Sequence, residues 1–203
     1  MKRIIALSIF IVITFTSISQ VTSSSQSVTN VEHLTFMGIP IDGSLDQFVV
    51  ELKKKGFALE TITDSQAELT GKFAGEDASI FVSTTPKTHL VYVVGVFYMK
   101  KTIWSAIKTQ YETMKSAFIE KYGKPLELVE KFERPGIDGS GLEFRELSAG
   151  RGDYKAIFKI KSPDGGITVQ ISSDGSSVGA FLSIIYFDQI NLTLKDSEIY
   201  SDI

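Results

Sequence analysis

The sequence predicts an α+β fold in which two tandem units, each a helix followed by about four strands, form one antiparallel sheet with both helices on one side. Two helical segments end alike, in KKKGF at 53–57 and in EKYGK at 120–124. Each is followed by strand-like segments that turn residues separate. The last such segment of each unit, 90–99 or 178–187, is apolar on both faces, unlike the strands before it.

Residues 1–19 have the pattern of a secretory signal peptide. The charged start MKR precedes an apolar stretch at 4–15, and Ser17 and Ser19 stand at −3 and −1 of a cut before Gln20. An uncleaved signal anchor is the alternative. The chain has no cysteine, so it lacks the residue that carries a bacterial lipid anchor. We expect a secreted or periplasmic bacterial protein that is not a lipoprotein, with a flexible tether at 20–33.

The first unit is predicted to span residues 34–100. A strand at 34–40 leads through IDGS to a helix that Ser44 caps, with Gln47 completing a capping box and Gly56 ending the helix. The apolar positions of this helix have the spacing i, i+3, i+4 and i+7 and form one buried stripe: Leu45, Phe48, Val49 and Leu52. The strands predicted after it are 57–63, 67–73, 78–83 and 89–99.

The second unit is predicted to span residues 101–190. Its helix runs from about 103 to 122, with Thr102 as N-cap and Gly123 at its end. Aromatic, Met and Ile side chains recur every three or four residues and are interpreted as core: Trp104, Ile107, Tyr111, Met114 and Phe118. The strands that we expect are 126–132, 142–147, 153–161, 167–172 and 178–187, and residues 191–203 form a C-terminal tail.

A second match favours an internal repeat. AGEDASIF at 74–81 is similar to AGRGDYKAIF at 149–158, and the order of elements in the two units agrees. This order resembles the β-lactamase inhibitor protein-like fold, which small secreted bacterial proteins of unknown function share. The resemblance covers 34–187 and implies a concave, often aromatic sheet face that grips a partner protein. The inhibitor proteins are stapled by disulfides, which this chain lacks, so no inhibitory residue is carried over.

Composition and motifs exclude several classes of function. The net charge is −3 without a basic face, so nucleic acid is not an expected partner. The two histidines, His33 and His89, lack zinc-site spacing, and neither a P-loop nor a nucleophile elbow occurs. A second long apolar run is also missing, so we expect no membrane span after signal cleavage. The sequence therefore predicts no catalytic, metal or cofactor site.

The doubly apolar strands instead predict protein or peptide binding, of an inhibitor or envelope-assembly type. One face should meet the helices, while the other is covered by the tether or tail, lies in a dimer, or binds a partner. The candidate residues are Tyr92, Tyr98, Phe181 and Phe187 on these strands, and Asp138 and Ser140 in a glycine loop interpreted as mobile.

Other readings stay open. Both strands could be central strands with a second covering layer. A secreted hydrolase or lyase could use paired carboxylates, although the densest acidic set, Glu127, Glu130 and Glu133, alternates between faces of a strand. A homo-oligomeric scaffold domain is the third possibility.

Overall fold

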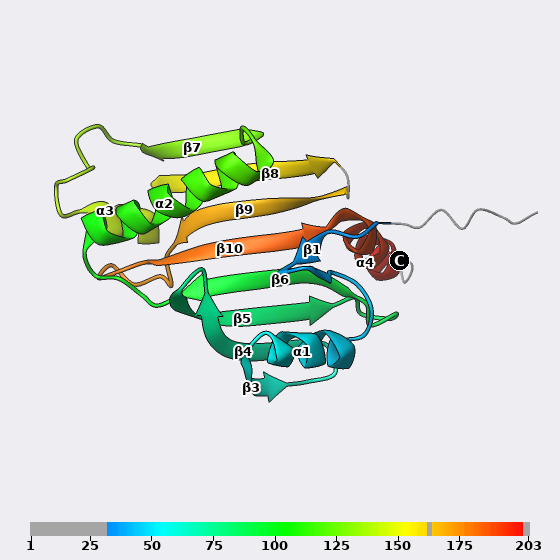
Figure 1. Ribbon diagram of the computed structural model, residues 1–203. Helices are drawn as coiled ribbons and strands as arrows, with labels where there is room; N and C mark the ends of the chain where they lie inside the picture. Colours follow the sequence, from blue (N-terminus) through cyan, green and yellow to red (C-terminus); the bar gives the residue numbers. More distant parts are fainter. Residues whose placement is uncertain (1–31, 162–163, 201–203) are drawn as a thin grey trace, which may run out of the picture. The chain divides into compact units, whose positions relative to one another are not determined.

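The computed structural model describes residues 32–161 and 164–200 (Figure 1). The signal peptide predicted at 1–19 and nearly all of the tether at 20–33 lie outside the described residues. The strands are β1 Thr35–Phe36, β2 Ile39–Pro40, β3 Ala58–Ile62, β4 Gln66–Phe73, β5 Glu76–Thr84, β6 Val91–Tyr98, β7 Glu127–Phe132, β8 Gly152–Lys161, β9 Asp164–Ser172 and β10 Phe181–Asp188. The helices are α1 Leu45–Lys54, α2 Trp104–Tyr122, α3 Glu143–Ser148 and α4 Gln189–Tyr200.

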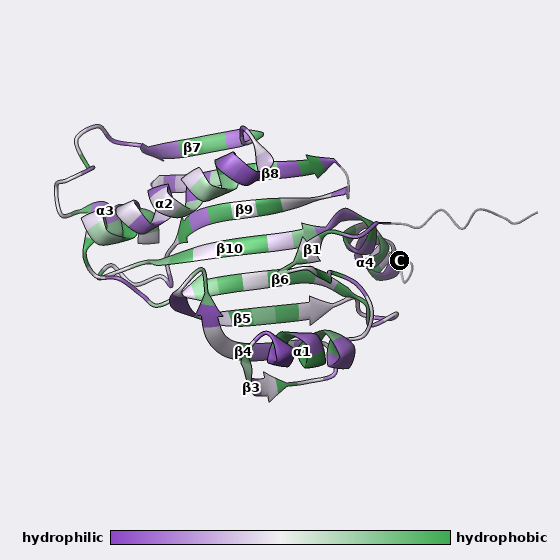
Figure 2. Cartoon of the chain, viewed as in Figure 1, coloured by the Kyte–Doolittle hydropathy of each residue, from purple (hydrophilic) through white to green (hydrophobic). Residues whose placement is uncertain are grey.

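The described residues form one eight-stranded antiparallel sheet, with strand order β3-β4-β5-β6-β10-β9-β8-β7, and a two-stranded sheet of β1 and β2. Four strands come from each predicted unit, and the two sets meet where β6 pairs with β10. These two central strands carry long hydrophobic stretches (Figure 2). The predicted α+β class is therefore confirmed, and the two halves share one continuous sheet.

One face of this sheet carries α1, α2 and the β1–β2 hairpin. Helix α1 contacts β3, β4 and β5, α2 contacts β8, β9 and β10, and the hairpin lies between the two helices (Figure 1). Phe36 of the hairpin is fully buried there, and its ring centroid lies 5.5 Å from that of Phe73 and 5.2 Å from that of Tyr186. Since Phe73 belongs to β4 and Tyr186 to β10, Phe36 connects the cores of the two halves.

Helix α1 forms as its sequence predicts. The Ser44 hydroxyl accepts a hydrogen bond from the Gln47 N–H at 3.4 Å, and Gly56 has a φ of 95°, which favours glycine. The four residues of the predicted apolar stripe are all buried: Leu45, Phe48, Val49 and Leu52. In α2 the five predicted core residues are also buried: Trp104, Ile107, Tyr111, Met114 and Phe118. The Thr102 cap is wrong, because α2 begins after Ile103 without a side-chain capping bond.

The predicted strand at 142–147 is wrong, because residues 143–147 belong to α3. The segment LEFREL fits strand alternation, but it also places Phe144 and Leu147 three residues apart, on one side of a helical turn. Both side chains are buried, and the Phe144 ring lies 6.0 Å from the Trp104 ring. The second half therefore has four strands, like the first, with α3 inserted after β7.

The predicted match between 74–81 and 149–158 does not join equivalent elements. The first segment lies mostly on β5, the third strand of its half, whereas the second lies mostly on β8, the second strand of its half. The equivalence between the closing strands does hold, because β6 and β10 are the two central strands. The predicted strand at 34–40 is also corrected to the β1–β2 hairpin, which turns at Met37 and Gly38 with φ values of 52° and 80°.

The predicted C-terminal tail is helical over most of its length. Helix α4 follows β10 directly and reaches the β5–β6 loop, where the Glu198 carboxylate accepts hydrogen bonds from the backbone N–H groups of Lys87 (2.7 Å) and Thr88 (3.1 Å). At its other end, the Asn191 amide donates to the Val91 carbonyl (2.9 Å), the Ile41 carbonyl (3.2 Å) and Asp42 (2.9 Å). These contacts fix α4 across one end of the sheet.

His33 belongs to a polar network at the end of β10. Its side chain is 16% exposed and lies between two carboxylates, 3.1 Å from Asp188 Oδ1 and 3.6 Å from Asp42 Oδ2. Asp188 is fully buried and also accepts a hydrogen bond from the Leu34 N–H at 2.9 Å. This network ties the start of the described chain to the end of β10.

Candidate functional site

The face of the sheet opposite α1 and α2, hereafter the open face, is apolar at its centre and polar at its flanks. Strand alternation places one side chain of every two on this face, and the pairing aligns them in rows. One row runs Glu68, Phe81, Gly95, Ile185, Thr168. The next row runs Thr70, Ser79, Phe97, Ser183, Gln170, Lys155. The apolar members come from β5, β6 and β10.

Three phenylalanines on this face form what we call the phenylalanine cluster: Phe81, Phe97 and Phe181. The rings of Phe81 and Phe97 meet edge to face, with centroids 5.2 Å apart and an interplanar angle of 88°. The Phe181 ring lies 5.9 Å from that of Phe97. Phe97 and Phe181 are half-buried and Phe81 is 41% exposed, so the cluster presents apolar surface to its surroundings.

Glycines let aromatic rings lie close against the open face. A Cβ at Gly95 would come within 2.7 Å of the Phe97 ring and 3.2 Å of Ile185 Cδ1. On β9, a Cβ at Gly166 would come within 2.2 Å of the Phe187 ring. Since real Cβ atoms do not approach so closely, a side chain at either glycine would displace its ring. The two glycines therefore fix how far these aromatic rings stand out from the sheet.

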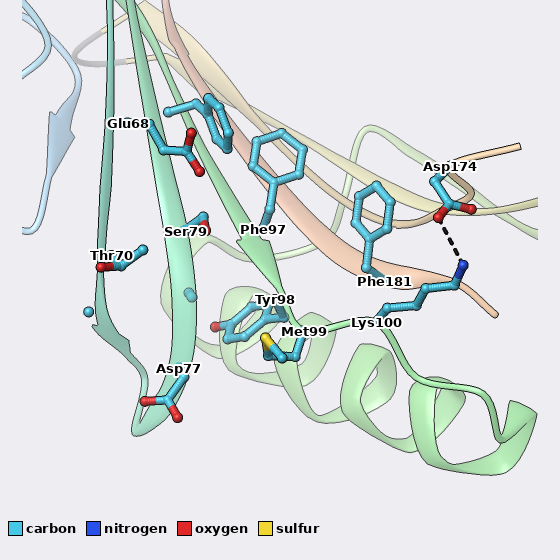
Figure 3. A pocket seen from close by; sticks show the side chains of 13 residues that line it. Glu68, Thr70, Asp77, Ser79, Phe97, Tyr98, Met99, Lys100, Asp174 and Phe181 are labelled. Carbon is cyan, nitrogen blue, oxygen red and sulfur yellow. Dashed lines mark hydrogen bonds and ion pairs between the residues drawn. The ribbon is translucent and has the colours of Figure 1, made fainter. Parts of the chain in front are cut away.

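A groove of about 880 Å³ adjoins the phenylalanine cluster (Figure 3). Its walls come from β4, β5, β6, the start of β10 and the loop before β10, and Met99, 73% exposed, lies at its margin. Across one end, Lys100 Nζ lies 2.8 Å from Asp174 Oδ2 and 2.5 Å from Ser176 Oγ. The hydrogen bond from Lys100 is the main reason that the pKa of Asp174 falls to about 2.

The carboxylates of this groove do not converge. Figure 3 shows Glu68, Asp77 and Asp174 on separate sides of it. Asp77 is paired with Lys72 at 3.0 Å and Asp174 with Lys100, so two of the three carboxylates are already neutralised. In the part of the chain that the structure describes, no group of three or more His, Cys, Asp or Glu residues could hold a metal ion. The groove combines an apolar floor with a polar rim, an arrangement suited to binding.

The four aromatic residues predicted for partner binding lie in different places. Phe181 belongs to the phenylalanine cluster. Tyr98 lines the groove but is only 4% exposed, and its hydroxyl donates to the Phe73 carbonyl at 3.4 Å, while burial raises its pKa. Phe187 lies on the open face against Gly166, outside the groove lining. Tyr92 lies under α4, with Lys195 Nζ 5.8 Å from its ring centroid.

The predicted loop residues Asp138 and Ser140 are not brought near the groove. The Asp138 carboxylate accepts hydrogen bonds from Trp104 Nε1 at 2.6 Å and from Lys108 Nζ at 2.5 Å, and the Lys108 bond is the main cause of its lowered pKa. The Gly139 N–H donates to Glu143 at 2.6 Å. The loop interpreted as mobile is thus attached to α2 and α3, and Asp138 is occupied by intramolecular partners.

Phe81, Phe97 and the Lys100–Asp174 pair are the site residues that sequence reasoning missed. The sequence does hold one indication of Phe81: it lies on the same face of its strand as Ser79 and Ser83, a face that is otherwise polar. The sequence gives no indication of the Lys100–Asp174 pair, since its members are 74 residues apart and meet only when β6 and β10 pair.

Comparison with known proteins places the chain in no group: no family model, no curated protein and no solved structure matches it. Among the described residues, no helix combines the length and apolarity that crossing a membrane requires.

Proposed function

We propose that this chain is a secreted or periplasmic, non-catalytic binding module that holds a segment of a partner protein, or a peptide, on the open face of its sheet. The observation that carries the proposal is the phenylalanine cluster. Three rings gather on the face opposite the helices, beside a groove whose rim includes a highly exposed methionine. Exposed apolar groups that gather in one place and have a polar rim are characteristic of protein-binding sites.

The groove suits a partner with apolar side chains and a polar backbone. The rings of Phe81 and Phe97 offer edges and faces against which a Leu, Met or aromatic side chain of the partner packs. Around them, Thr70, Ser79 and Lys100 supply hydrogen-bonding groups for the backbone of the partner. The resemblance of the element order to the β-lactamase inhibitor protein-like fold favours the same use of the sheet, with an envelope protein as partner.

A peptide selection with matched variants tests this proposal. Peptides are selected on the wild-type chain from a random displayed library, and their affinities are then measured by calorimetry for wild type, Phe81→Ser and Phe181→Ser. We expect each substitution to weaken binding at least about tenfold, since an aromatic anchor contributes more than about 1.4 kcal/mol. Val50→Ser is the control, because Val50 is 50% exposed on α1, on the opposite side of the sheet.

Two results would overturn the proposal. One is a selection that enriches no peptide. The other is a set of enriched peptides that bind Phe81→Ser and Phe181→Ser as tightly as they bind wild type and Val50→Ser. Circular dichroism of each variant establishes that the loss of binding does not come from loss of folding.

A further inference from the structure

The outer edge of β7 is a second surface without a partner, separate from the groove. Strand β7 ends the strand order of the large sheet, and within the described residues it pairs with β8 alone (Figure 1). Two leucines stand out from the surface here: Leu128 of β7 is 50% exposed, and Leu126, just before the strand, is 73% exposed. An unpaired strand edge of this kind is a template for adding another strand.

The hydrogen bonds between β7 and β8 determine which residues the free edge offers. The Glu133 N–H donates to the Arg151 carbonyl at 2.9 Å, one step beyond the pair Phe132–Gly152. In an antiparallel ladder, hydrogen-bonded pairs recur every second residue, so the odd-numbered residues of β7 bond to β8. The N–H and C=O groups of Leu128 and Glu130 therefore point away from the sheet, and an added strand must bond to these even-numbered residues.

A second copy of β7 meets this requirement in one favourable register. When two copies run antiparallel about Val129, Leu128 of each lies opposite Glu130 of the other, which joins the outward-pointing backbone groups of both. In the same register, Glu127 of each copy lies opposite Lys131 of the other, so two Glu–Lys pairs form on the open-face side. At Leu126 the backbone N–H stays bonded to the Ile157 carbonyl at 2.7 Å, so the new backbone bonds join Leu128 and Glu130 of the two copies. Backbone and charge contacts agree in this arrangement.

The neighbouring registers with the same backbone pattern are worse. A shift that puts Glu130 opposite itself also puts Glu127 opposite Glu133, and like charges directly opposite destabilise a pair of strands. A shift in the other sense puts Leu128 opposite itself and loses both Glu–Lys pairs. Lys131 makes no ion pair elsewhere in the described residues, whereas Glu127 already lies 3.1 Å from Lys155. The second copy therefore supplies a carboxylate, that of its Glu127, to pair with Lys131.

The other edge of the sheet is less suited to pairing. Strand β3 has five residues, and its register with β4 shifts between Leu59 and Thr61. Such an irregularity interrupts the regular row of donors and acceptors that an added strand needs. Association through β7 alone is isologous, so it closes at two copies and does not continue into a filament.

We propose that two copies of this chain form a symmetric dimer through antiparallel pairing of their β7 strands about Val129. The large sheet then continues from one copy into the other, and both open faces lie on the same side. This inference does not rest on the proposed function, because the groove and the β7 edge share no residue.

Cross-linking tests the register directly. The chain has no cysteine, so Val129→Cys introduces the only thiol. In the proposed dimer the two thiols belong to a non-hydrogen-bonded pair with Cα atoms about 4.5 Å apart, which is within disulfide range. We expect mild oxidation to convert Val129→Cys to a covalent dimer that reductant reverses, while Val50→Cys, exposed on α1, stays largely monomeric. Equal cross-linking of the two variants would overturn the register.

Charge exchange tests the pairing without a covalent bond. In sedimentation equilibrium, we expect wild type to dimerise and Lys131→Glu or Glu127→Lys to weaken dimerisation about tenfold, because each turns two attractive pairs into repulsive ones. The double variant E127K/K131E restores the complementary pairs and should restore dimerisation. A monomeric wild type, single variants that dimerise normally, or a double variant without rescue would each contradict the proposal. Circular dichroism confirms folding of every variant.

Discussion

Substitution of Phe36 by Ala removes the side chain that joins the cores of the two halves. The ring is fully buried and contacts Phe73 from the first half and Tyr186 from the second. Loss of a buried phenylalanine costs about 3–5 kcal/mol, which includes the cavity left behind. Because the ring packs against residues of both halves, on a hairpin that lies between the two helices, we expect about 4 kcal/mol. This is a large part of the stability of a typical domain, about 5–15 kcal/mol.

Urea unfolding, followed by far-ultraviolet circular dichroism and by the fluorescence of the only tryptophan, Trp104, measures this loss. Phe81→Ala is the matched control, since it removes the same side chain from a position that is 41% exposed, and we expect it to cost only about 1 kcal/mol. Trp104 lies in the second half, so its signal shows whether a change in the hairpin destabilises that half too. Equal losses for Phe36→Ala and Phe81→Ala, or a loss below about 1 kcal/mol for Phe36→Ala, would refute the reasoning.

Three further outcomes are expected. Hydrogen bonds from Arg151 hold the pKa of the Glu146 carboxyl at about 2, below its ordinary 4.5. The contribution of Glu146 to stability is therefore present above pH 4.5 and is lost as the pH falls towards 2. The urea midpoint of wild type should drop more between pH 6 and pH 2.5 than that of Glu146→Gln. Asn191→Ala should cost about 1–3 kcal/mol and speed hydrogen exchange in α4, and unchanged exchange would contradict this reading of the amide contacts. Gly166→Ala should cost about 1–3 kcal/mol by displacing the Phe187 ring, a loss that a double-mutant cycle with Phe187→Ala should show to be non-additive.

Local rules predicted the elements whose determinants lie close together in the chain. Ser44, Gly56 and the apolar stripe between them specify α1 within a dozen residues, and the structure agrees with all three. The segment at 142–147 shows where such rules fail. Six residues are too few to separate a period of 2 from a period of 3.6, and the buried Glu146 is stabilised by Arg134 and Arg151, which the helical pattern alone does not reveal.

The candidate site could not be predicted in the same way, because strand register creates it. Phe81 and Phe97 are adjacent only because Phe81 lies opposite Gly95, and a glycine at that position leaves room for the Phe97 ring. The apolar character of both faces of its strand predicts Phe181 as part of the candidate site. The same argument fails for Tyr98 on the equivalent strand, because its side chain faces the buried side of the sheet. Sequence alternation separates the two faces of a strand without showing which face the helices cover.

The position of β10 in the centre of the sheet has a consequence for the order of folding. It is the last strand of the described residues, yet it lies between β6 and β9 and completes both halves of the sheet. Its partner β6 ends at Tyr98, so this pairing closes a loop of some 80 residues, a contact of the kind that slows folding. Until residues 181–188 have been synthesised and have paired, both β6 and β9 have an unpaired edge in the most apolar part of the sheet. A chain made from its N-terminus therefore completes its core only when its last strand is available, and in that interval it depends on protection from aggregation.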